Sequence, residues 1–284
     1  MLVLAARARE AAPPSPPPVP AGLREALDAF QPVDASLLER RALLRRTDTK
    51  FLLRIDGLAP VLRALAGHHG VLLAGGERMA AYETLYFDAP GLSGYHDHAR
   101  GRTPRHKVRA RHYPDRGTSF LEVKSKTNRG RTEKARRPHP FGEAALSDEE
   151  VAWALGITGW AGGALLPQAW TRFRRITLVG LQEDERVTVD VDLRVDRPPL
   201  GRRLHGLAVV EVKQARPDPR SPAVLALRRA GARQHPVSKY AVAMALLASG
   251  VRRNRLLPTL REIERYDTWQ SYSARIGSST RATS

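Results

Sequence analysis

Cysteine is absent from this 284-residue chain, which excludes disulfide bonds, thiolate metal sites and cysteine nucleophiles. Its absence is also consistent with a reducing compartment. No apolar run approaches the roughly 20 residues that a membrane-spanning helix needs. Aromatic residues make up 6% of the chain, so stacking platforms for single-stranded nucleic acid are few. These absences predict a soluble, cytoplasmic protein with no membrane insertion and no specific nucleic-acid partner.

Acidic residues are also few relative to basic ones: 29 against 47, which gives a formal net charge of +18. A charge of this size predicts an anionic partner, such as nucleic acid, anionic lipid or a phosphorylated ligand. The excess is concentrated, because residues 98–137 hold fourteen Lys and Arg but three Asp and Glu. This concentration favours a binding site, and a solvated basic face is the alternative at this point.

The composition divides the chain into three segments. Residues 1–21 are rich in proline and predict a disordered leader, 22–250 predict one folded domain, and 251–284 form a basic tail. Within the domain, strand-like segments dominate and helical segments separate them, which predicts the α+β class. Strands are expected at 46–53, 82–87, 106–113, 119–126, 169–178, 186–195 and 207–212, and helices at 22–44, 58–69, 147–156, 222–229 and 237–249.

Basic side chains alternate with apolar ones along the expected strands. Arg105, Lys107, Arg109 and Arg111 fall two residues apart, and residues two apart on a strand share one face. Each such strand alone fits an ordinary half-buried sheet with a polar outer face. Several together would place like charges side by side, and these repel one another unless an anion neutralises them. Similar alternation recurs at Glu122-Val-Lys124-Ser-Lys126, Arg186-Val-Thr-Val-Asp190-Val-Asp192 and Glu211-Val-Lys213.

A sheet closed into a barrel with this face inward would form a basic tunnel, with helices covering its apolar outside. Arginine forks suit phosphate oxygens, and lysines supply mobile point charges. The acids on the same faces are Glu122, Asp190, Asp192 and Glu211, and they could hold a hard divalent cation that bridges phosphates.

Several segments, taken in order, resemble a known family. They are Tyr82-Glu-Thr-Leu-Tyr86-Phe87-Asp88, Tyr95-His-Asp-His98-Ala-Arg-Gly101, Arg105-His-Lys107-Val-Arg109-Ala-Arg111-His-Tyr113, Phe120-Leu-Glu122-Val-Lys124-Ser-Lys126, Trp170-Thr-Arg172, Arg186-Val-Thr-Val-Asp190, Val210-Glu211-Val-Lys213 and Ser238-Lys239-Tyr240. Together they resemble the VTC domain, the polyphosphate polymerase domain of the triphosphate tunnel metalloenzyme, or CYTH-like, superfamily. The resemblance spans roughly residues 35–250.

The resemblance implies an antiparallel β-barrel tunnel with helices packed outside. It also implies transfer of the ATP γ-phosphate to a growing polyphosphate chain, with Mn²⁺ or Mg²⁺ as cofactor. Glu211 would hold the metal, with Glu122 as a second ligand. Catalytic roles fall on Lys50, Arg109, Arg111 and Lys239. Phosphate binding falls on Lys107, Lys124, Lys126, Lys134, Arg172, Arg186 and Ser238, where Lys107 and Lys126 are included because they share strand faces with the others.

Two departures from the family pattern bear on the reaction. The superfamily's N-terminal Glu-x-Glu-x-Lys is Arg46-Thr-Asp48-Thr-Lys50 here, and Trp170 replaces the usual tyrosine. The first departure weakens one alternative, a metal-dependent tripolyphosphatase or nucleoside triphosphatase, because activating water needs more metal-ligating carboxylates. The other alternative is a non-catalytic protein that binds polyphosphate, RNA or another polyanion. A polymerase needs no side-chain nucleophile, since positioning and charge stabilisation supply most of the catalysis of phosphoryl transfer.

Overall fold

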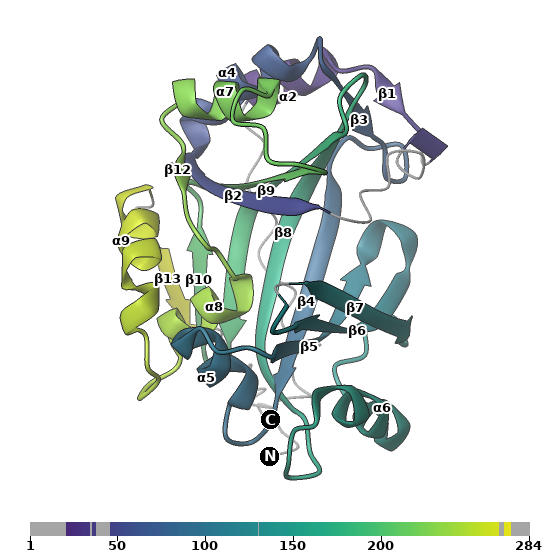
Figure 1. The fold of residues 1–284 in the computed structure, drawn as a ribbon, viewed down its shortest axis with the longest axis vertical. Coiled ribbons are helices and arrows are strands. Elements are labelled where there is room, and N and C mark those ends of the chain that lie inside the picture. The colour runs from purple at the N-terminus through teal and green to yellow at the C-terminus, as the bar shows by residue number, and fades with distance from the viewer. Residues whose placement is uncertain (1–20, 35, 38–45, 130, 267–269, 274–284) are drawn as a thin grey trace, which may run out of the picture.

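One curled sheet forms the centre of the fold (Figure 1). The structure is a computed structural model, which describes residues 21–34, 36–37, 46–129, 131–266 and 270–273. The sheet has thirteen strands. They are β1 (Pro32–Val33), β2 (Thr47–Arg54), β3 (His69–Leu72), β4 (Ala80–Asp88), β5 (Arg105–Tyr113), β6 (Thr118–Lys126), β7 (Thr132–Pro138), β8 (Leu166–Gly180), β9 (Glu185–Arg197), β10 (Leu200–Leu204), β11 (Leu207–Gln214), β12 (Arg233–Gln234) and β13 (Gln270–Ser273).

The main hydrogen-bonded path through the sheet runs β12-β2-β11-β9-β8-β4-β5-β6-β7. Every neighbouring pair along it is antiparallel. Among the described residues, β12 and β7 end this path without pairing to each other. The predicted α+β class and antiparallel, tunnel-like sheet are therefore confirmed, although the hydrogen bonding does not close the sheet into a complete barrel.

The seven expected strands all form, each within a few residues of its expected ends. Strand β7 is one that the sequence pattern did not predict. Its sequence, Thr-Glu-Lys-Ala-Arg-Arg-Pro, is mostly charged and exposed, so it lacks the apolar alternation that marks a strand. It forms because β6 supplies a paired edge, in a register that places Lys134 opposite Lys124 and Arg136 opposite Glu122.

Most helices cover the outer, apolar face of the sheet. Helices α2 (Ala21–Asp28), α4 (Leu58–Leu65) and α7 (Pro222–Arg229) lie together at one end of the molecule (Figure 1). Their apolar side chains pack on those of β2, β9 and β11 to form one core cluster. Helix α6 (Asp148–Thr158) packs over β5 and β6, against Val108 and Leu121 among others. These contacts use the apolar strand positions, so the alternating basic positions face the other way.

Helix α6 begins where its sequence indicates. The Ser147 side chain accepts a hydrogen bond from the Glu150 N–H, and the Glu150 carboxylate accepts one from the Ser147 N–H. This reciprocal pair is a capping box, and it fixes the start of the helix that the sequence predicts at 147–156. Between β5 and β6, residues 114–117 form a tight turn, with Gly117 at a positive φ of 58°.

Helix α8 (Lys239–Leu247) is an exception to the expectation that helices pack only outside. Seven of its nine residues are buried, which is typical of a helix that is apolar on every side. It shares a core cluster with Leu52 and Val209, which lie on the same strand faces as Lys50 and Glu211. The Tyr240 ring also stacks on that of Tyr86, with centroids 5.0 Å apart. Helix α8 therefore covers the apolar part of the inner face.

Helix α5 (Ser93–Arg100) is tied to α8 through the buried carboxylate of Asp88. This carboxylate accepts hydrogen bonds from the Tyr240 hydroxyl at 2.6 Å and from the Gly94 and Tyr95 N–H groups, each at 2.9 Å. Burial raises the pKa of Asp88 in spite of these donors. The network fixes the start of α8, where two of the predicted site residues lie: Ser238 as the N-cap and Lys239 as the first helical residue.

Part of the expected basic tail is folded. Helix α9 (Leu257–Tyr266) buries Leu260 and Ile263 in the same core cluster as α8, and the backbone of β13 pairs with β10. The expected leader lies outside the described residues, apart from Ala21. In the described part of the chain, no helix combines the length and apolarity needed to cross a membrane.

Candidate functional site

The inner face of the sheet encloses a large cavity of about 2540 Å³. Strands β2, β5, β6, β7, β8, β9 and β11 all contribute to its lining. Among the described residues, sixteen Lys and Arg but four Asp and Glu line it. A concave surface with so one-sided a charge attracts and concentrates anions.

Ten of the thirteen predicted site residues line this cavity. The shared basic face of β5 is confirmed, since Arg105, Lys107, Arg109 and Arg111 are all among the lining residues. Segments that are far apart in the sequence therefore meet around one space. The ten are Lys50, Lys107, Arg109, Arg111, Lys124, Lys126, Lys134, Arg186, Glu211 and Ser238.

Arg172 lies on the opposite face of β8 from the cavity, contrary to the prediction. It pairs with the Asp196 carboxylate at 2.6 Å and lies over the Trp170 ring, 4.9 Å from its centroid. Thr171 and Phe173 take the other face of the strand, and the alternation then brings Arg175 to the cavity. Arg175, three residues further on, is therefore the arginine of this segment that lines the cavity.

Asp192 is displaced from the predicted face as well. It has a φ of 51°, and the pairing of β8 with β9 shifts register between Arg172 and Arg174. Such a bulge breaks the simple alternation of a strand. The Asp192 carboxylate faces Arg194 at 3.4 Å and Arg203 at 3.3 Å instead of joining the cavity acids.

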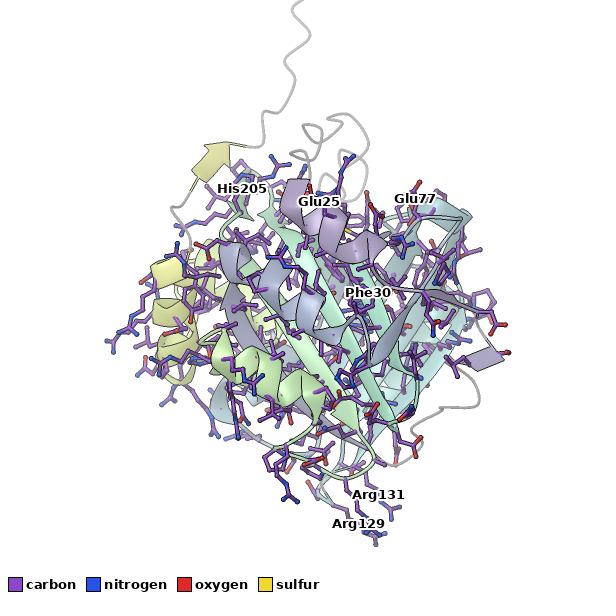
Figure 2. The ribbon with its side chains drawn as sticks, turned by 90° about the horizontal axis from the view of Figure 1, so that it is seen from above. Glu25, Phe30, Glu77, Arg129, Arg131 and His205 are labelled. Carbon is purple, nitrogen blue, oxygen red and sulfur yellow. The ribbon has the colours of Figure 1, made fainter. Side chains whose placement is uncertain are left out.

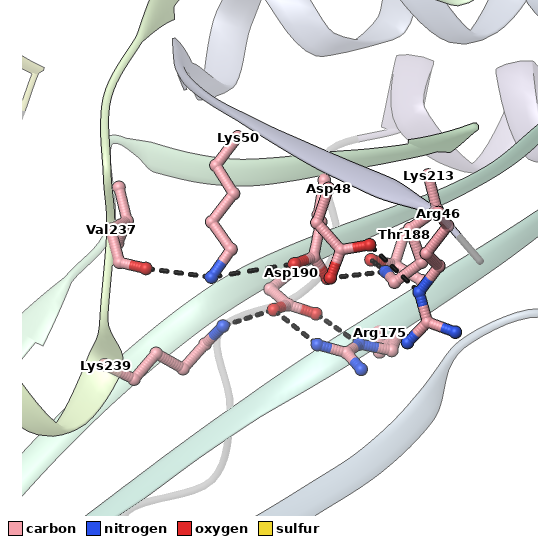
Figure 3. A network of polar contacts seen from close by, with 10 residues as sticks. Arg46, Asp48, Lys50, Arg175, Thr188, Asp190, Lys213, Val237 and Lys239 are labelled. Carbon is pink, nitrogen blue, oxygen red and sulfur yellow. Dashed lines mark hydrogen bonds and ion pairs between the residues drawn. The ribbon is translucent and has the colours of Figure 1, made fainter. Parts of the chain in front are cut away.

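Asp190 joins Arg175, which lines the cavity, to Lys239 (Figure 3). Arg175 donates from Nε and Nη2 to the two carboxylate oxygens, at 2.6 and 2.8 Å. The Lys239 ammonium pairs with the same carboxylate, so Lys239 positions this group instead of lining the cavity. Burial acts to raise the pKa of Asp190, but Arg175 and Lys239 outweigh it and lower the pKa. Asp190 is therefore ionised and holds the Arg175 guanidinium in place.

Glu211 forms a second paired group on the neighbouring strands, with Lys50 and Lys213. Its carboxylate lies 2.5 Å from Lys213 Nζ and 3.6 Å from Lys50 Nζ. Lys50 also donates to the Val237 carbonyl at 2.9 Å, next to the N-cap Ser238 of α8. Burial opposes ionisation, but the two lysines lower the pKa of Glu211. This places a carboxylate, two ammonium groups and a helix N-terminus at one wall of the cavity, and such N-termini favour anions.

Glu122 lies beneath the cations of β5 and β7 and does not line the cavity. Its side chain is 1% exposed, and it pairs with Arg109 at 2.6 Å and with Lys134. Burial acts to raise its pKa, but Arg109, Arg111 and Lys134 hold the pKa at about 2. Because both carboxylate oxygens pair with cations and the side chain does not reach the cavity, Glu122 fits the role of positioning Arg109 better than the role of a metal ligand.

The inner cations repel one another strongly in the absence of an anion. Burial lowers the pKa of Lys107 well below its ordinary value, and Lys50, Lys124 and Arg105 lower it further. His98, which also lines the cavity from α5, has its pKa lowered to about 2 by burial and by the nearby Lys107 and Arg105. A polyanion in the cavity would relieve this repulsion.

Comparison with known proteins supports the resemblance drawn from the sequence. Residues 45–147 match the VTC domain. The predicted resemblance is thus confirmed over this segment, which includes β2 to β7 and carries Lys50, Arg109 and Lys134. The opposite wall, with Arg175, Arg186 and Glu211, follows the matched VTC segment in the chain. No curated protein matched this chain.

Solved structures give distant similarities. HpAC1 from Hippeastrum, described as an adenylyl cyclase with a dominant triphosphatase activity, is 15% identical, with a TM-score of 0.46. The alignment covers 70% of this chain and 96% of that one. A Bacillus halodurans protein described as an adenylate cyclase is 14% identical, with a TM-score of 0.45 and coverage of 72% and 98%. These similarities are too distant to assign an activity to this chain.

The pH dependence of phosphate binding should report on Lys124, which faces Lys107 across the pair of strands in the VTC segment. Burial, together with repulsion from Lys50, lowers the pKa of Lys124 to about 8. Its charge is therefore lost as the pH rises through about 8, whereas an ordinary lysine keeps its charge to about 10.4.

We expect tripolyphosphate to bind roughly tenfold more weakly at pH 9 than at pH 7, because a hydrogen bond to a charged group contributes about 1.5–3 kcal/mol. Calorimetric titration at both pH values measures the change. A Lys124→Met variant should bind more weakly at pH 7 and show a smaller loss between the two values. An unchanged pH dependence in that variant would assign the titration to another group.

Proposed function

We propose that this chain is a polyphosphate polymerase that transfers the γ-phosphate of ATP to the end of a polyphosphate chain. The observation that carries the proposal is the cavity, in which sixteen described Lys and Arg from segments far apart in the sequence converge on one space. The VTC match over residues 45–147 supports it, because this segment supplies most of those cations. A long cationic cavity suits a substrate with many phosphates in a row.

The chemistry needs positioning and charge stabilisation from the protein, and no side-chain nucleophile. A terminal oxygen of polyphosphate attacks the γ-phosphorus of ATP, the bond from that phosphorus to the β–γ bridging oxygen breaks, and ADP leaves. Arg109 and Arg111 on one wall and Arg175 and Arg186 on the other can bind the oxygens of the transferred group. Asp190 and Glu122 keep Arg175 and Arg109 oriented for this role.

The donor groups of the cavity fit a divalent cation held by one protein carboxylate. Glu211 lines the cavity with its side chain 17% exposed, whereas Glu122 is enclosed by Arg109 and Lys134. In the described part of the chain, no three His, Asp or Glu residues are grouped so as to hold a metal. Mg²⁺ often takes one or two carboxylates and fills its shell with substrate phosphates and water. We propose that Glu211 would hold Mn²⁺ or Mg²⁺ in this way, where the cation would neutralise charge on the phosphates.

One experiment separates this proposal from hydrolysis and from simple binding. Purified protein is incubated with ATP and Mn²⁺, the products are resolved on a gel stained for polyphosphate, and free phosphate is assayed in the same samples. We expect long chains with ADP as the coproduct. Free phosphate without chains would identify a triphosphatase instead. The absence of both products, with retained binding of polyphosphate, would leave a non-catalytic polyanion-binding protein.

A further inference from the structure

Aromatic side chains form a row at one end of the cavity. Phe173 of β8, Tyr82 of β4, Tyr113 of β5 and Phe120 of β6 each come from a different, adjacent strand. Their ring centroids lie 5.2, 5.2 and 6.2 Å apart in that order. Since aromatic residues are only 6% of the chain, four in one continuous row is a marked local concentration. We call these four residues the aromatic row.

The aromatic row faces the site and not the outer core. Tyr82, Tyr113 and Phe120 line the cavity, and each is half-buried, while Phe173 is buried behind Tyr82. Leaving apolar ring surface in a water-filled cavity is unfavourable, and a cavity that holds phosphates alone does not need it. These rings therefore offer a surface for a planar, partly apolar group of the ligand.

Guanidinium groups lie over the rings of the aromatic row. Arg136 lies over the Phe120 ring at 4.8 Å, and Arg111 and Arg175 lie over the Tyr82 ring at 5.4 and 4.9 Å. Aromatic rings and arginine planes are the surfaces on which nucleic-acid bases stack, and such stacking tolerates any base. Arg111 and Arg175 also belong to the phosphate-binding part, so one ligand could contact both surfaces.

The opposite end of the cavity has a different chemistry. Along β5 and β6 it is marked by Arg105 and Lys126, about 26 Å from Tyr113 at the usual rise of a strand. Arg129 and Arg131 in the following turn project from the edge of the molecule (Figure 2). Among the described lining residues at this end, there are cations and no Phe, Tyr or Trp. The cavity is thus polar and cationic at one end and aromatic at the other.

We propose that the aromatic row is a nucleobase platform, which makes a nucleoside triphosphate a better ligand than inorganic tripolyphosphate with the same phosphates. The proposal rests on the proposed function, because it places the ATP donor with its base on Phe120 and Tyr113 and its phosphates on the deeper arginines. The platform should accept purines and pyrimidines alike, since stacking surfaces without directed hydrogen bonds do not distinguish bases strongly.

The test compares two ligands on the full chain, ATP and inorganic tripolyphosphate, by calorimetric titration at fixed Mn²⁺. Phe120→Leu and Tyr113→Leu keep an apolar side chain but remove the ring. We expect each variant to bind ATP about tenfold more weakly, since base stacking contributes about 1–3 kcal/mol. Tripolyphosphate should bind both variants as it binds the wild type, which also shows that they fold. The matched control is Phe141→Leu, because Phe141 is 48% exposed and lies outside the cavity.

An equal loss of affinity for both ligands would overturn the proposal, because the rings would then only shape the cavity. Unchanged ATP affinity in both variants would overturn it as well. The result is independent of turnover: ring-dependent ATP binding without polyphosphate synthesis would support the platform and contradict the polymerase. Polyphosphate synthesis by the wild type, with unchanged ATP affinity in both ring variants, would support the polymerase and contradict the platform.

Discussion

Arg175→Ala is expected to lower polyphosphate synthesis by about 10²–10³-fold, the usual effect of removing one preorganised donor from a charged transition state. Arg175 lines the cavity, and its Nε–Nη2 edge is held by Asp190. The bidentate pair leaves the Nη1 side of the guanidinium for a phosphate oxygen. Because Lys239 still pairs with Asp190 in this variant, the carboxylate is not left without a cation. The rate of chain synthesis from ATP measures the effect.

Arg172→Ala is the matched control for this variant. It removes the same side chain from the same strand, three residues away, but on the face that contacts Asp196 and Trp170. We expect its synthesis rate to stay close to that of the wild type. Arg175→Lys should recover only part of the activity, because an ammonium cannot form the bidentate pair. A strong defect in Arg172→Ala together with an active Arg175→Ala would instead assign phosphate binding to Arg172, as the sequence predicts.

The contrast between these two arginines shows which features the sequence could predict. Alternation predicts faces well along a regular strand, so Lys107, Arg109, Arg111 and Lys124 were placed correctly on the cavity wall. The choice between Arg172 and Arg175 depended instead on which face of β8 turns inward. In the run Trp170-Thr-Arg-Phe-Arg-Arg175 either face carries an arginine, so alternation alone does not decide.

Features that depend on long-range packing could not be read from local sequence. Strand β7 is held by its pairing with β6 and carries no apolar pattern of its own. The sequence predicts a helix at the position of α8. Its place on the inner face depends on the uncharged side chains of Leu52, Tyr86 and Val209, which lie there and pack against it. The aromatic row is likewise invisible along the chain, since its four members come from four separate strands.

Glu122→Gln is expected to lower the free energy of unfolding by about 3 kcal/mol, the lower end of the cost of breaking a buried ion pair. The carboxylate is 1% exposed and pairs with Arg109 and Lys134, so the variant leaves two cations without their anion. The lower value applies because the Lys134 side chain is 42% exposed and keeps part of its hydration. Urea unfolding of the free protein measures the loss. Tripolyphosphate should restore part of it by neutralising the same cations.

The loss of stability of the wild type in acid tests whether Glu122 is ionised in the folded protein. The pKa of Glu122 is about 2 in the folded protein against an ordinary value of 4.5. Its contribution to stability is therefore complete above about pH 4.5 and is lost as the pH falls toward 2. Glu122→Gln should show a smaller loss of stability than the wild type across that interval. An equal loss in both proteins would contradict an ionised, paired Glu122.

The dependence of activity on metal separates Glu122 from Glu211. If Glu122 only positions Arg109, Glu122→Gln should synthesise polyphosphate more slowly but need the same Mn²⁺ concentration for half of its maximal rate. Glu211→Gln should need a higher concentration, because of these two glutamates Glu211 is the one that lines the cavity. The reverse pattern, with the Mn²⁺ requirement raised by Glu122→Gln and not by Glu211→Gln, would make Glu122 the metal ligand. To bind the metal, Glu122 would have to release Arg109 and Lys134, the two cations with which it pairs.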